Sequence, residues 1–345
     1  MDALDLPWLA QPLAQALAHA RSHALLVQGP AGVGQFDLAL LLAQAWLCEA
    51  APEARPADGR ACGHCGSCKL FQSRTHPDFQ ILLPDALRES LGWAADEAEG
   101  KEGKESKSKP SREIKIDAVR AMLGFTQTTP ARGRAKVVVV YPAEALNTVA
   151  ANALLKTLEE PAGALRFALA SMAPQALLPT IRSRCQPVPL GLPDAAQARD
   201  WLAARGVEQP DVLLAAAGGR PQQALDWAQD GLKAAAWLAL PGRLARGEVA
   251  AIADWPVPRA IDTLQRLAHD LLCLAHGAAP RFFPASSLPK KPVASAVTAW
   301  SRVLQQAARH AEHPLNAGLL LESLLLQGQA ALHPERNPER GVPRA

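Results

Sequence analysis

The stretch Gly29-Pro30-Ala31-Gly32-Val33-Gly34-Gln35-Phe36 follows an apolar run at 24–28 and precedes a helical pattern at 36–47. Strand, glycine turn and helix form the setting of the phosphate-binding loop G-x-x-x-x-G-K-[ST]. The glycine frame is present, but Gln35 replaces the lysine that reaches the β- and γ-phosphates, and Phe36 replaces the hydroxyl residue that binds Mg²⁺. The stretch therefore predicts an ATPase fold without ATP hydrolysis. The alternative is a glycine turn in an unrelated α/β protein.

A second element of such ATPases is an acidic pair after a buried strand, with one acid for Mg²⁺ and one to orient water. The candidate strand is the run of valines at 137–140. Tyr141 and Pro142 stand where the acids are expected, and Glu144 comes only after them. A carboxylate on the following helix is more often a capping or solvated charge than a general base. Both catalytic elements are missing together.

The composition is that of a globular chain of two or three domains. Its 345 residues are 49% hydrophobic, and no apolar run reaches the length of a membrane span. The N-terminal residues 1–5 lack the basic start and apolar run of a signal peptide, so we expect a cytoplasmic location. The formal net charge of +3 is too small for tight autonomous binding to nucleic acid, so any DNA contact should be shared with partners.

The first part of the chain, residues 1–190, alternates strand and helix patterns. Apolar runs occur at 24–28, 79–83, 137–141 and 167–170. This alternation predicts a mostly parallel sheet with helices on both faces. Residues 96–111 are charged and nearly free of apolar side chains, which predicts a disordered, solvated loop.

Beyond residue 190 the strand signals stop, and alanine and leucine recur at helical spacing. We predict a helical lid at 191–240, a second helical unit at 241–332 and a flexible tail at 333–345. One predicted helix carries an apolar stripe that fits packing against another helix or subunit: Ile261, Leu264, Leu267, Leu271 and Leu274.

Three of the six cysteines, Cys62, Cys65 and Cys68, stand at steps of three with glycines between them. In a reducing cytosol this spacing favours a metal site over disulfides. Tetrahedral zinc needs a fourth ligand, and Cys48, at the end of the helix after the glycine loop, is the nearest unused thiolate. We predict a zinc module at 48–68 with these four ligands.

Two histidines compete with Cys48 for the fourth position. His64 lies inside the tight turn between Cys62 and Cys65, where its ring would have to reverse direction, and His76 lies further along. No coordination position is left open, so the zinc is predicted to be structural rather than catalytic. Cys273 lies in an apolar helical run and is expected to be a buried core residue.

The segment Thr180-Ile181-Arg182-Ser183-Arg184-Cys185 places arginines just before the predicted domain boundary. An arginine at this place can be presented to a neighbouring subunit. Spacing alone, however, favours an ordinary pair of surface charges.

Together these segments resemble the clamp-loader family of AAA+ proteins. The resemblance is carried by the glycine loop, the four cysteines, and two long blocks: Asn152-Ala153-Leu154-Leu155-Lys156-Thr157-Leu158-Glu159-Glu160-Pro161 and Leu178-Pro179-Thr180-Ile181-Arg182-Ser183-Arg184-Cys185. It covers the α/β domain well, whereas the C-terminal third matches only in length and helical character. The resemblance implies an α/β AAA+ (RecA-like) domain with an inserted zinc module, a helical lid and an all-α C-terminal collar domain for oligomerisation.

The resemblance also implies a function: a non-catalytic clamp-loader subunit of DNA polymerase III, the DNA-directed DNA polymerase holoenzyme of DNA replication. Ser183-Arg184-Cys185 matches a family motif whose arginine, here Arg184, enters the ATP site of the adjacent motor subunit as a trans arginine finger. The implied partners are tau or gamma motor subunits and a delta subunit in a hetero-pentameric ring, and through the ring the sliding clamp and primed DNA. Polymerase activity is not ascribed to this chain.

Two alternative functions remain. Gly218-Gly219-Arg220-Pro221 resembles the sensor-two segment of motor subunits, in which an arginine touches the γ-phosphate. A divergent active ATPase would therefore use Gln35, Glu144 and Arg220. A stand-alone zinc-containing DNA-binding module is disfavoured by the modest charge and the lack of a basic aromatic surface.

Overall fold

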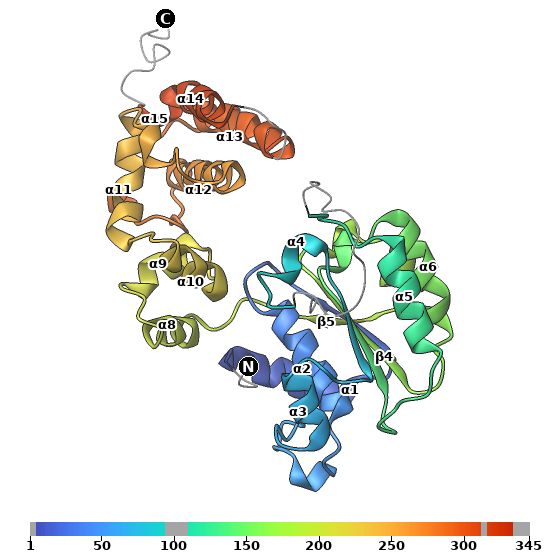
Figure 1. Cartoon of the computed structure of the whole chain (residues 1–345). Coiled ribbons are helices and arrows are strands. Elements are labelled where there is room, and N and C mark those ends of the chain that lie inside the picture. The colour runs from blue at the N-terminus through green and yellow to red at the C-terminus, as the bar shows by residue number, and fades with distance from the viewer. Residues whose placement is uncertain (1–4, 94–109, 312–315, 334–345) are drawn as a thin grey trace, which may run out of the picture. The chain divides into compact units, whose positions relative to one another are not determined.

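The computed structural model describes residues 5–93, 110–311 and 316–333 of the chain (Figure 1). The contacts divide the chain into two compact units, Met1–Gln197 and Ala198–Ala345. The division falls inside α8 (Ala195–Ala203), the first helix after the predicted boundary at residue 190. The predicted loop at 96–111 lies outside the described residues except for residues 110 and 111, and the predicted tail lies outside them except for His333.

A parallel five-stranded sheet forms the centre of the first unit, in the order β2-β3-β4-β1-β5. Its strands are β1 (Ala24–Gln28), β2 (Phe79–Leu82), β3 (Lys136–Val140), β4 (Leu165–Ser171) and β5 (Gln186–Pro189). The four predicted apolar runs are therefore confirmed as strands. The central strands read as continuous apolar runs because helices cover both of their faces.

The sequence analysis does not predict the fifth strand, β5, because this strand contains Pro187 and Pro189. Proline cannot donate a ladder hydrogen bond and is confined to edge strands. In this sheet β5 pairs only with β1 and lies at the edge, so the missing donors cost no pairing on a second side. After the strand, Leu190 N donates to Gln28 O at 2.8 Å, which continues the pairing with β1.

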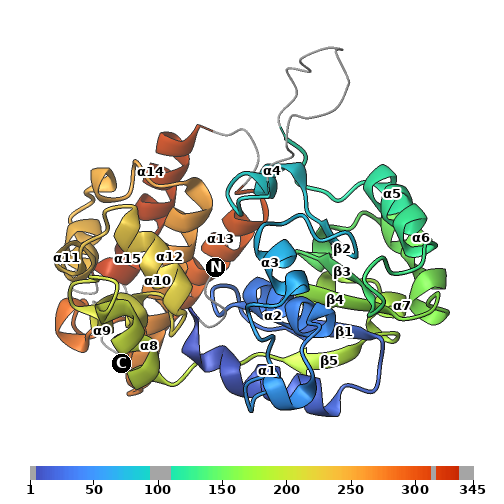
Figure 2. The same ribbon diagram turned by 60° about the horizontal axis from the view of Figure 1, so that its bottom comes forward.

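Helices cover the two faces of this sheet (Figure 2). The helical segments of the first unit include η1 (Pro7–Leu9), α1 (Ala10–His19), α2 (Gln35–Leu47), α3 (Gly66–Gln72), α4 (Asp85–Arg88), α5 (Ile116–Thr126), α6 (Thr148–Glu159) and α7 (Pro179–Arg182). Alternate strand residues such as Val138, Val140 and Phe167 pack with α5 and α6 in one buried cluster. On the opposite face α2 contacts β1, β3 and β4.

The described part of the second unit is helical. After α8 it contains α9 (Pro210–Ala216), α10 (Pro221–Gln229), α11 (Ala234–Ala245), α12 (Val257–Ala275), α13 (Ala294–Arg309), α14 (Ala317–Gln327) and α15 (Gln329–Leu332). The predicted lid boundary at residue 240 falls inside α11, which continues through Pro241. None of the described helices is long and apolar enough to cross a membrane.

The apolar stripe predicted on α12 is used within the unit. Ile261, Leu264, Leu267 and Leu271 are buried, and α12 packs mainly against α13. Leu274, the last residue of the stripe, is only partly buried. The helical spacing of these apolar residues therefore reflects helix packing inside the unit rather than a free contact surface.

Candidate functional site

The glycine loop joins β1 to α2, the arrangement expected from the sequence. Gly32 and Gly34 have φ values of 81° and 100°, which side chains rarely tolerate. Gly29 is needed for a different reason, because a Cβ atom there would lie 2.1 Å from Leu190 O beside β5. The loop thus keeps the backbone shape of a phosphate cradle.

The side chain of Gln35 is turned back onto this loop. Gln35 is 3% exposed, and its Nε2 lies 2.6 Å from Gly29 O and 2.5 Å from Pro30 O, donating to both carbonyls. Nearby, Trp8 in η1 donates from Nε1 to Val33 O at 2.8 Å. The amide therefore holds the loop together and supplies no positive charge where a lysine would meet phosphate.

The two positions that would hold Mg²⁺ ligands are filled by rings in contact. Phe36 stacks on Tyr141 with the ring centroids 4.7 Å apart and 29° between the planes. Burial raises the pKa of the Tyr141 phenol to about 12, with further contributions from Asp37 and Glu144. The phenol is therefore protonated at neutral pH and is a poor ligand for a cation.

Glu144, the remaining carboxylate near this strand end, lies in η3 (Ala143–Ala145). Its Oε1 accepts from the backbone N–H groups of Met172 and Ala173 at 3.0 and 3.2 Å. These bonds fix the chain after β4, which is a structural use of the carboxylate. Its buried Oε2 has no hydrogen-bond partner within the described ranges.

Arg184 follows the short helix α7 and is held by its own chain. Nε and Nη2 both donate to Glu159 Oε1 at the end of α6, with Nε at 2.7 Å. Nη1 donates to Thr180 O at 2.9 Å and more weakly to Ser183 Oγ at 3.4 Å. Cys185 is buried, which raises the pKa of its thiol to about 12 and makes it a core residue rather than a reactive one.

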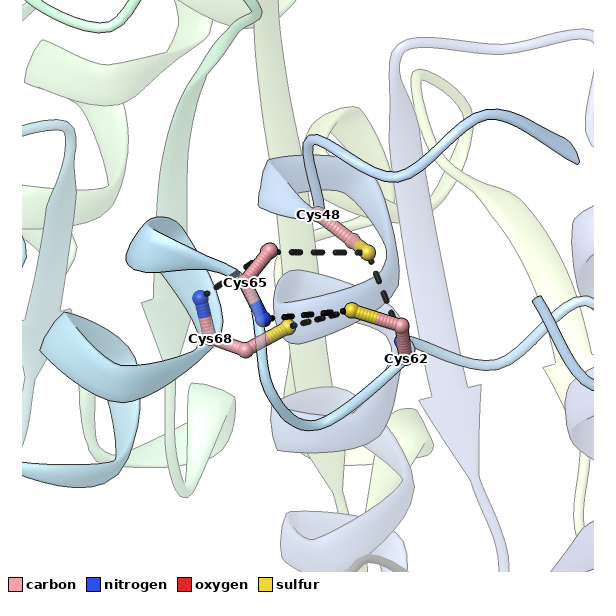
Figure 3. Close-up of side chains that lie close together, drawn as sticks. All are labelled: Cys48, Cys62, Cys65 and Cys68. Atoms are coloured by element: carbon pink, nitrogen blue, oxygen red, sulfur yellow. Dashed lines mark hydrogen bonds between the residues drawn. The ribbon is translucent and has the colours of Figure 1, made fainter. Parts of the chain in front are cut away.

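The four predicted cysteine ligands come together at the end of α2 and the start of α3 (Figure 3). Cys48 Sγ lies 4.0 Å from Cys65 Sγ, Cys62 Sγ lies 3.9 Å from Cys68 Sγ, and all four sulfurs are within 4.8 Å of one another. Sulfurs placed about 2.3 Å from a tetrahedral zinc are separated by about 3.8 Å. The sulfur positions therefore fit a single zinc ion.

Backbone donors surround these sulfurs. The N–H groups of Cys62, Cys65 and Cys68 each lie 3.4 Å from the sulfur of Cys48, Cys62 and Cys65 respectively. Burial acts to raise the pKa of Cys65, but the N–H of Cys68 and neighbouring groups outweigh it and lower that pKa to about 6. Burial and the bond with Cys65 raise the pKa of Cys68. Donors aimed at sulfur favour thiolate, the form that binds zinc.

Neither competing histidine joins the sulfur group. His64 is exposed, with Nδ1 2.8 Å from Cys62 O. His76 is 5% exposed, with Nε2 bonded to Ser67 Oγ at 3.0 Å and Nδ1 accepting from Asp78 N at 3.0 Å. The geometry favours Cys48 as the fourth ligand.

A polar network that the sequence did not indicate connects the cysteine cluster to the sheet. Arg132 Nε donates to Glu49 Oε1 at 2.6 Å and to Ser67 Oγ at 3.1 Å. Asp78, 1% exposed, accepts from the backbone of Ala131 and Arg132 and lies 3.6 Å from Lys136 Nζ on β3. No spacing rule links these residues, because their contacts join segments far apart in the chain.

The expectation that Cys273 is a buried core residue is wrong. Cys273 is partly exposed and lies near His269 and Asp270, a group of three potential metal ligands. Asp270, however, accepts from the backbone N–H groups of Arg281, Phe282 and Phe283 at 2.7–2.8 Å. Its carboxylate fixes a turn.

Arg220, the other residue considered for phosphate contact, donates from Nε to Ala217 O at 2.7 Å. Burial lowers the pKa of its guanidinium, and the nearby Arg266 lowers it further. The guanidinium thus bonds the turn to which Arg220 itself belongs.

A parallel α/β unit that contains this glycine loop and a Ser-Arg-Cys segment, and that is followed by a helical unit, is the architecture of the AAA+ clamp-loader class. A sequence profile described as "DNA polymerase III, delta subunit" matches residues 8–193. The DNA polymerase III subunit delta' of Escherichia coli is 33% identical over 287 residues, 79% of this chain and 78% of that protein. The chain belongs to the DNA polymerase III delta-prime family.

Other proteins also match parts of the chain. The subunit delta' of Pseudomonas aeruginosa is 42% identical over 204 residues, which are 58% of this chain and only 54% of that protein's length. The subunit tau of Salmonella typhimurium is 34% identical over 180 residues, 52% of this chain and 23% of that protein. A solved gamma subunit-related protein from Thermotoga maritima aligns with a TM-score of 0.47 at 17% identity, covering 94% of this chain and 99% of that one.

Proposed function

We propose that this chain is a clamp-loader subunit of DNA polymerase III that does not hydrolyse ATP and supplies Arg184 in trans to a neighbouring ATPase subunit. The observation that carries the proposal is the stacked pair of Phe36 and Tyr141, which fills the two positions from which Mg²⁺ ligands would come. Phosphoryl transfer in this class depends on Mg²⁺ and a lysine to neutralise developing charge. In this chain the rings of Phe36 and Tyr141 stand in place of the Mg²⁺ ligands, and Gln35 stands in place of the lysine.

The contacts of Gln35, Glu144 and Arg220 count against the alternative of a divergent active ATPase. Gln35 bonds carbonyls of its own loop, Glu144 bonds the backbone after β4, and Arg220 bonds its own turn. A functional ATP site would have to break these contacts before the side chains could reach phosphate or water. A non-hydrolysing subunit needs no such rearrangement.

The support for a trans arginine is the accessibility of Arg184. Its side chain is 30% exposed and follows α7 on the surface of the first unit. A guanidinium in this position can meet a phosphate on another subunit, and an arginine finger is worth about 10³- to 10⁵-fold in rate. The chain would complete an active site that belongs to its neighbour.

The names of the relatives suggest the partners. We infer a hetero-pentameric ring with a delta subunit and tau or gamma motor subunits in the bacterial cytoplasm, which loads the sliding clamp on primed DNA. Residues 191–240 would be the lid and residues 241–332 the oligomerisation domain. One structural Zn²⁺ would be held by Cys48, Cys62, Cys65 and Cys68, whose sulfurs lie within 4.8 Å of one another.

The test has two stages. First, Mg-ATP binding and hydrolysis are measured on the purified chain alone, where we expect neither; clear turnover would favour the divergent ATPase. Second, the ring is reconstituted with Arg184→Ala, which should lower ATP turnover at the adjacent site by about 10³-fold or more and abolish clamp loading. The matched control is Arg182→Ala, an exposed arginine two positions earlier. Unchanged turnover with Arg184→Ala in an intact ring would contradict the arginine-finger proposal.

A further inference from the structure

We infer that Glu159 is the positioning residue for Arg184, holding its guanidinium so that one edge faces outward toward the phosphate of a neighbouring subunit. This inference rests on the proposed function of Arg184. Glu159 is the last residue of α6, and Arg184 lies 25 positions later, beyond β4 and α7. The two residues belong to different segments that the fold brings together at one place on the surface.

The hydrogen bonds define which edge of the guanidinium is used. Nε and Nη2 form one edge, and both donate to the same oxygen of Glu159, with Nε 2.7 Å away. Nη1 is held from the other side by Thr180 O at 2.9 Å. Because each terminal nitrogen carries two hydrogens, Nη2 keeps an N–H that no acceptor among the described residues uses. That N–H, on the edge opposite the side chain's stem, is the group available to an external phosphate.

Hydrogen bonds that orient Arg184 matter because an unrestrained arginine side chain has many rotamers. Charge stabilisation in a transition state is effective when the donor is already oriented and needs no reorganisation during the reaction. Glu159 and Thr180 fix the plane of the guanidinium from two sides, so the side chain does not have to be ordered at each turnover. Glu159 itself does not reach the neighbour and acts only through Arg184.

Because the side chains of Arg184 and Glu159 are partly exposed, we expect removal of the Glu159 carboxylate to lower ATP turnover only modestly. The side chains of Arg184 and Glu159 are 30% and 47% exposed, and ion pairs with such access to water are weakened by screening. Loss of the carboxylate should therefore loosen the arginine without removing it. This separates a positioning residue from Arg184, whose own removal deletes the charge.

The chain offers a matched control in the adjacent residue. Glu160 is exposed, carries the same charge, and makes no ion pair among the residues that the structure describes. In the reconstituted ring, Glu159→Gln should lower the kcat for clamp-dependent ATP turnover by roughly three- to fivefold with the KM for ATP unchanged. Glu160→Gln should leave both constants within experimental error of the wild-type ring. Ring assembly by size-exclusion chromatography is measured for every variant.

A double-mutant cycle distinguishes positioning from a general structural role. If Glu159 acts through Arg184, Glu159→Gln has no further effect on kcat in a ring that already carries Arg184→Ala. The inference would be overturned if Glu159→Gln lowered kcat equally in rings with Arg184 and in rings with Arg184→Ala. It would also be overturned if rings carrying Glu159→Gln and rings carrying Glu160→Gln had the same kcat. In those cases a large loss with Arg184→Ala still supports the proposed function. Should Glu159→Gln prevent assembly, Glu159→Asp, which keeps the charge on a shorter stem, is measured in the same cycle.

Discussion

Phe36 and Tyr141 stack with their centroids 4.7 Å apart, and the pair joins the first turn of α2 to the end of β3. In a working phosphate-loop ATPase, these two places carry a hydroxyl and a carboxylate that share one Mg²⁺. In this chain an aromatic contact lies at those two places. The stacked pair ties the start of α2, directly after the glycine loop, to the end of β3.

The first prediction concerns the stability that this aromatic pair provides. Phe36 is 7% exposed, and Phe36→Ala should lower the free energy of unfolding by about 3 kcal/mol, because buried phenylalanine leaves a cavity when truncated. Urea unfolding of the zinc-replete chain measures the change. Val149→Ala, at a side chain that is 61% exposed, serves as the control and should change it by less than about 0.5 kcal/mol. Similar midpoints for the two variants would show that the stacked pair does not stabilise the fold.

The second prediction concerns recovery of the lost lysine. Gln35→Lys restores the sequence of the phosphate loop at one position, but Phe36 and Tyr141 still occupy the places of the Mg²⁺ ligands. We therefore expect no Mg-ATP hydrolysis by the variant. Loss of the two amide bonds to Gly29 O and Pro30 O should also destabilise the chain by about 1–3 kcal/mol. A phosphate-release assay combined with urea unfolding tests both parts, and turnover by the single variant would show that the aromatic pair does not block the site.

Local sequence patterns predicted those parts of the molecule that depend on neighbours in the chain. The apolar run of β1, the glycines and the start of α2 lie in one continuous stretch. The three-residue spacing of Cys62, Cys65 and Cys68 is a local pattern typical of a metal-binding turn, and the structure brings these sulfurs together. Cys48 could be predicted as the fourth ligand because it directly follows the preceding helix, α2. Each of these inferences needed only local geometry.

Two residue contacts that the sequence analysis does not predict form only because of the order of the strands in the sheet. The stack of Phe36 on Tyr141 requires α2 to lie over β3, and the bond of Arg184 to Glu159 requires α7 to lie beside α6. Neither arrangement follows from spacing along the chain. Strand β5 was missed for a different reason: its two prolines weaken a strand pattern, and only its place at the sheet edge makes them acceptable.

The third prediction is the metal content of the cysteine cluster. Purified protein should contain about one zinc per chain, and Cys68→Ser should lose it, because Cys68 is 1% exposed and its sulfur lies 3.9 Å from that of Cys62. Cys273→Ser is the matched control, since Cys273 lies outside the four-sulfur group. Zinc is measured by atomic emission after dialysis against a weak chelator. Well under one zinc in the wild-type chain, or equal zinc in both variants, would exclude this site.

The same experiment bears on folding. A structural zinc site contributes its binding free energy to the folded state, because unfolded chains rarely hold preformed sites. Strong chelation should therefore lower the unfolding midpoint of the wild-type chain and of Cys273→Ser, and should leave Cys68→Ser unchanged. A chelator that lowers all three midpoints equally would be acting elsewhere in the protein.

The fourth prediction concerns pH and the buried imidazole of His76. Burial lowers the pKa of His76 below its ordinary value of 6.5, although Asp78 acts in the opposite direction. The folded chain therefore resists protonation that the unfolded chain accepts. Well above pH 6.5 both states carry neutral imidazole, and this residue adds no pH dependence. As the pH falls through 6.5, the unfolded state gains the proton first and the free energy of unfolding decreases.

The variant His76→Gln removes this titration and keeps a side chain that can donate to Ser67 Oγ, the partner of His76 Nε2 at 3.0 Å. Urea unfolding at about pH 7.5 and about pH 5.5 should show a smaller loss of stability on acidification for the variant than for the wild type. Protonation of the cysteine thiolates affects both proteins, so the difference between their two losses isolates His76. Equal losses would mean that the imidazole takes up its proton in the folded chain as readily as in the unfolded chain. Protonation of Nδ1 would then break the hydrogen bond that it accepts from Asp78 N.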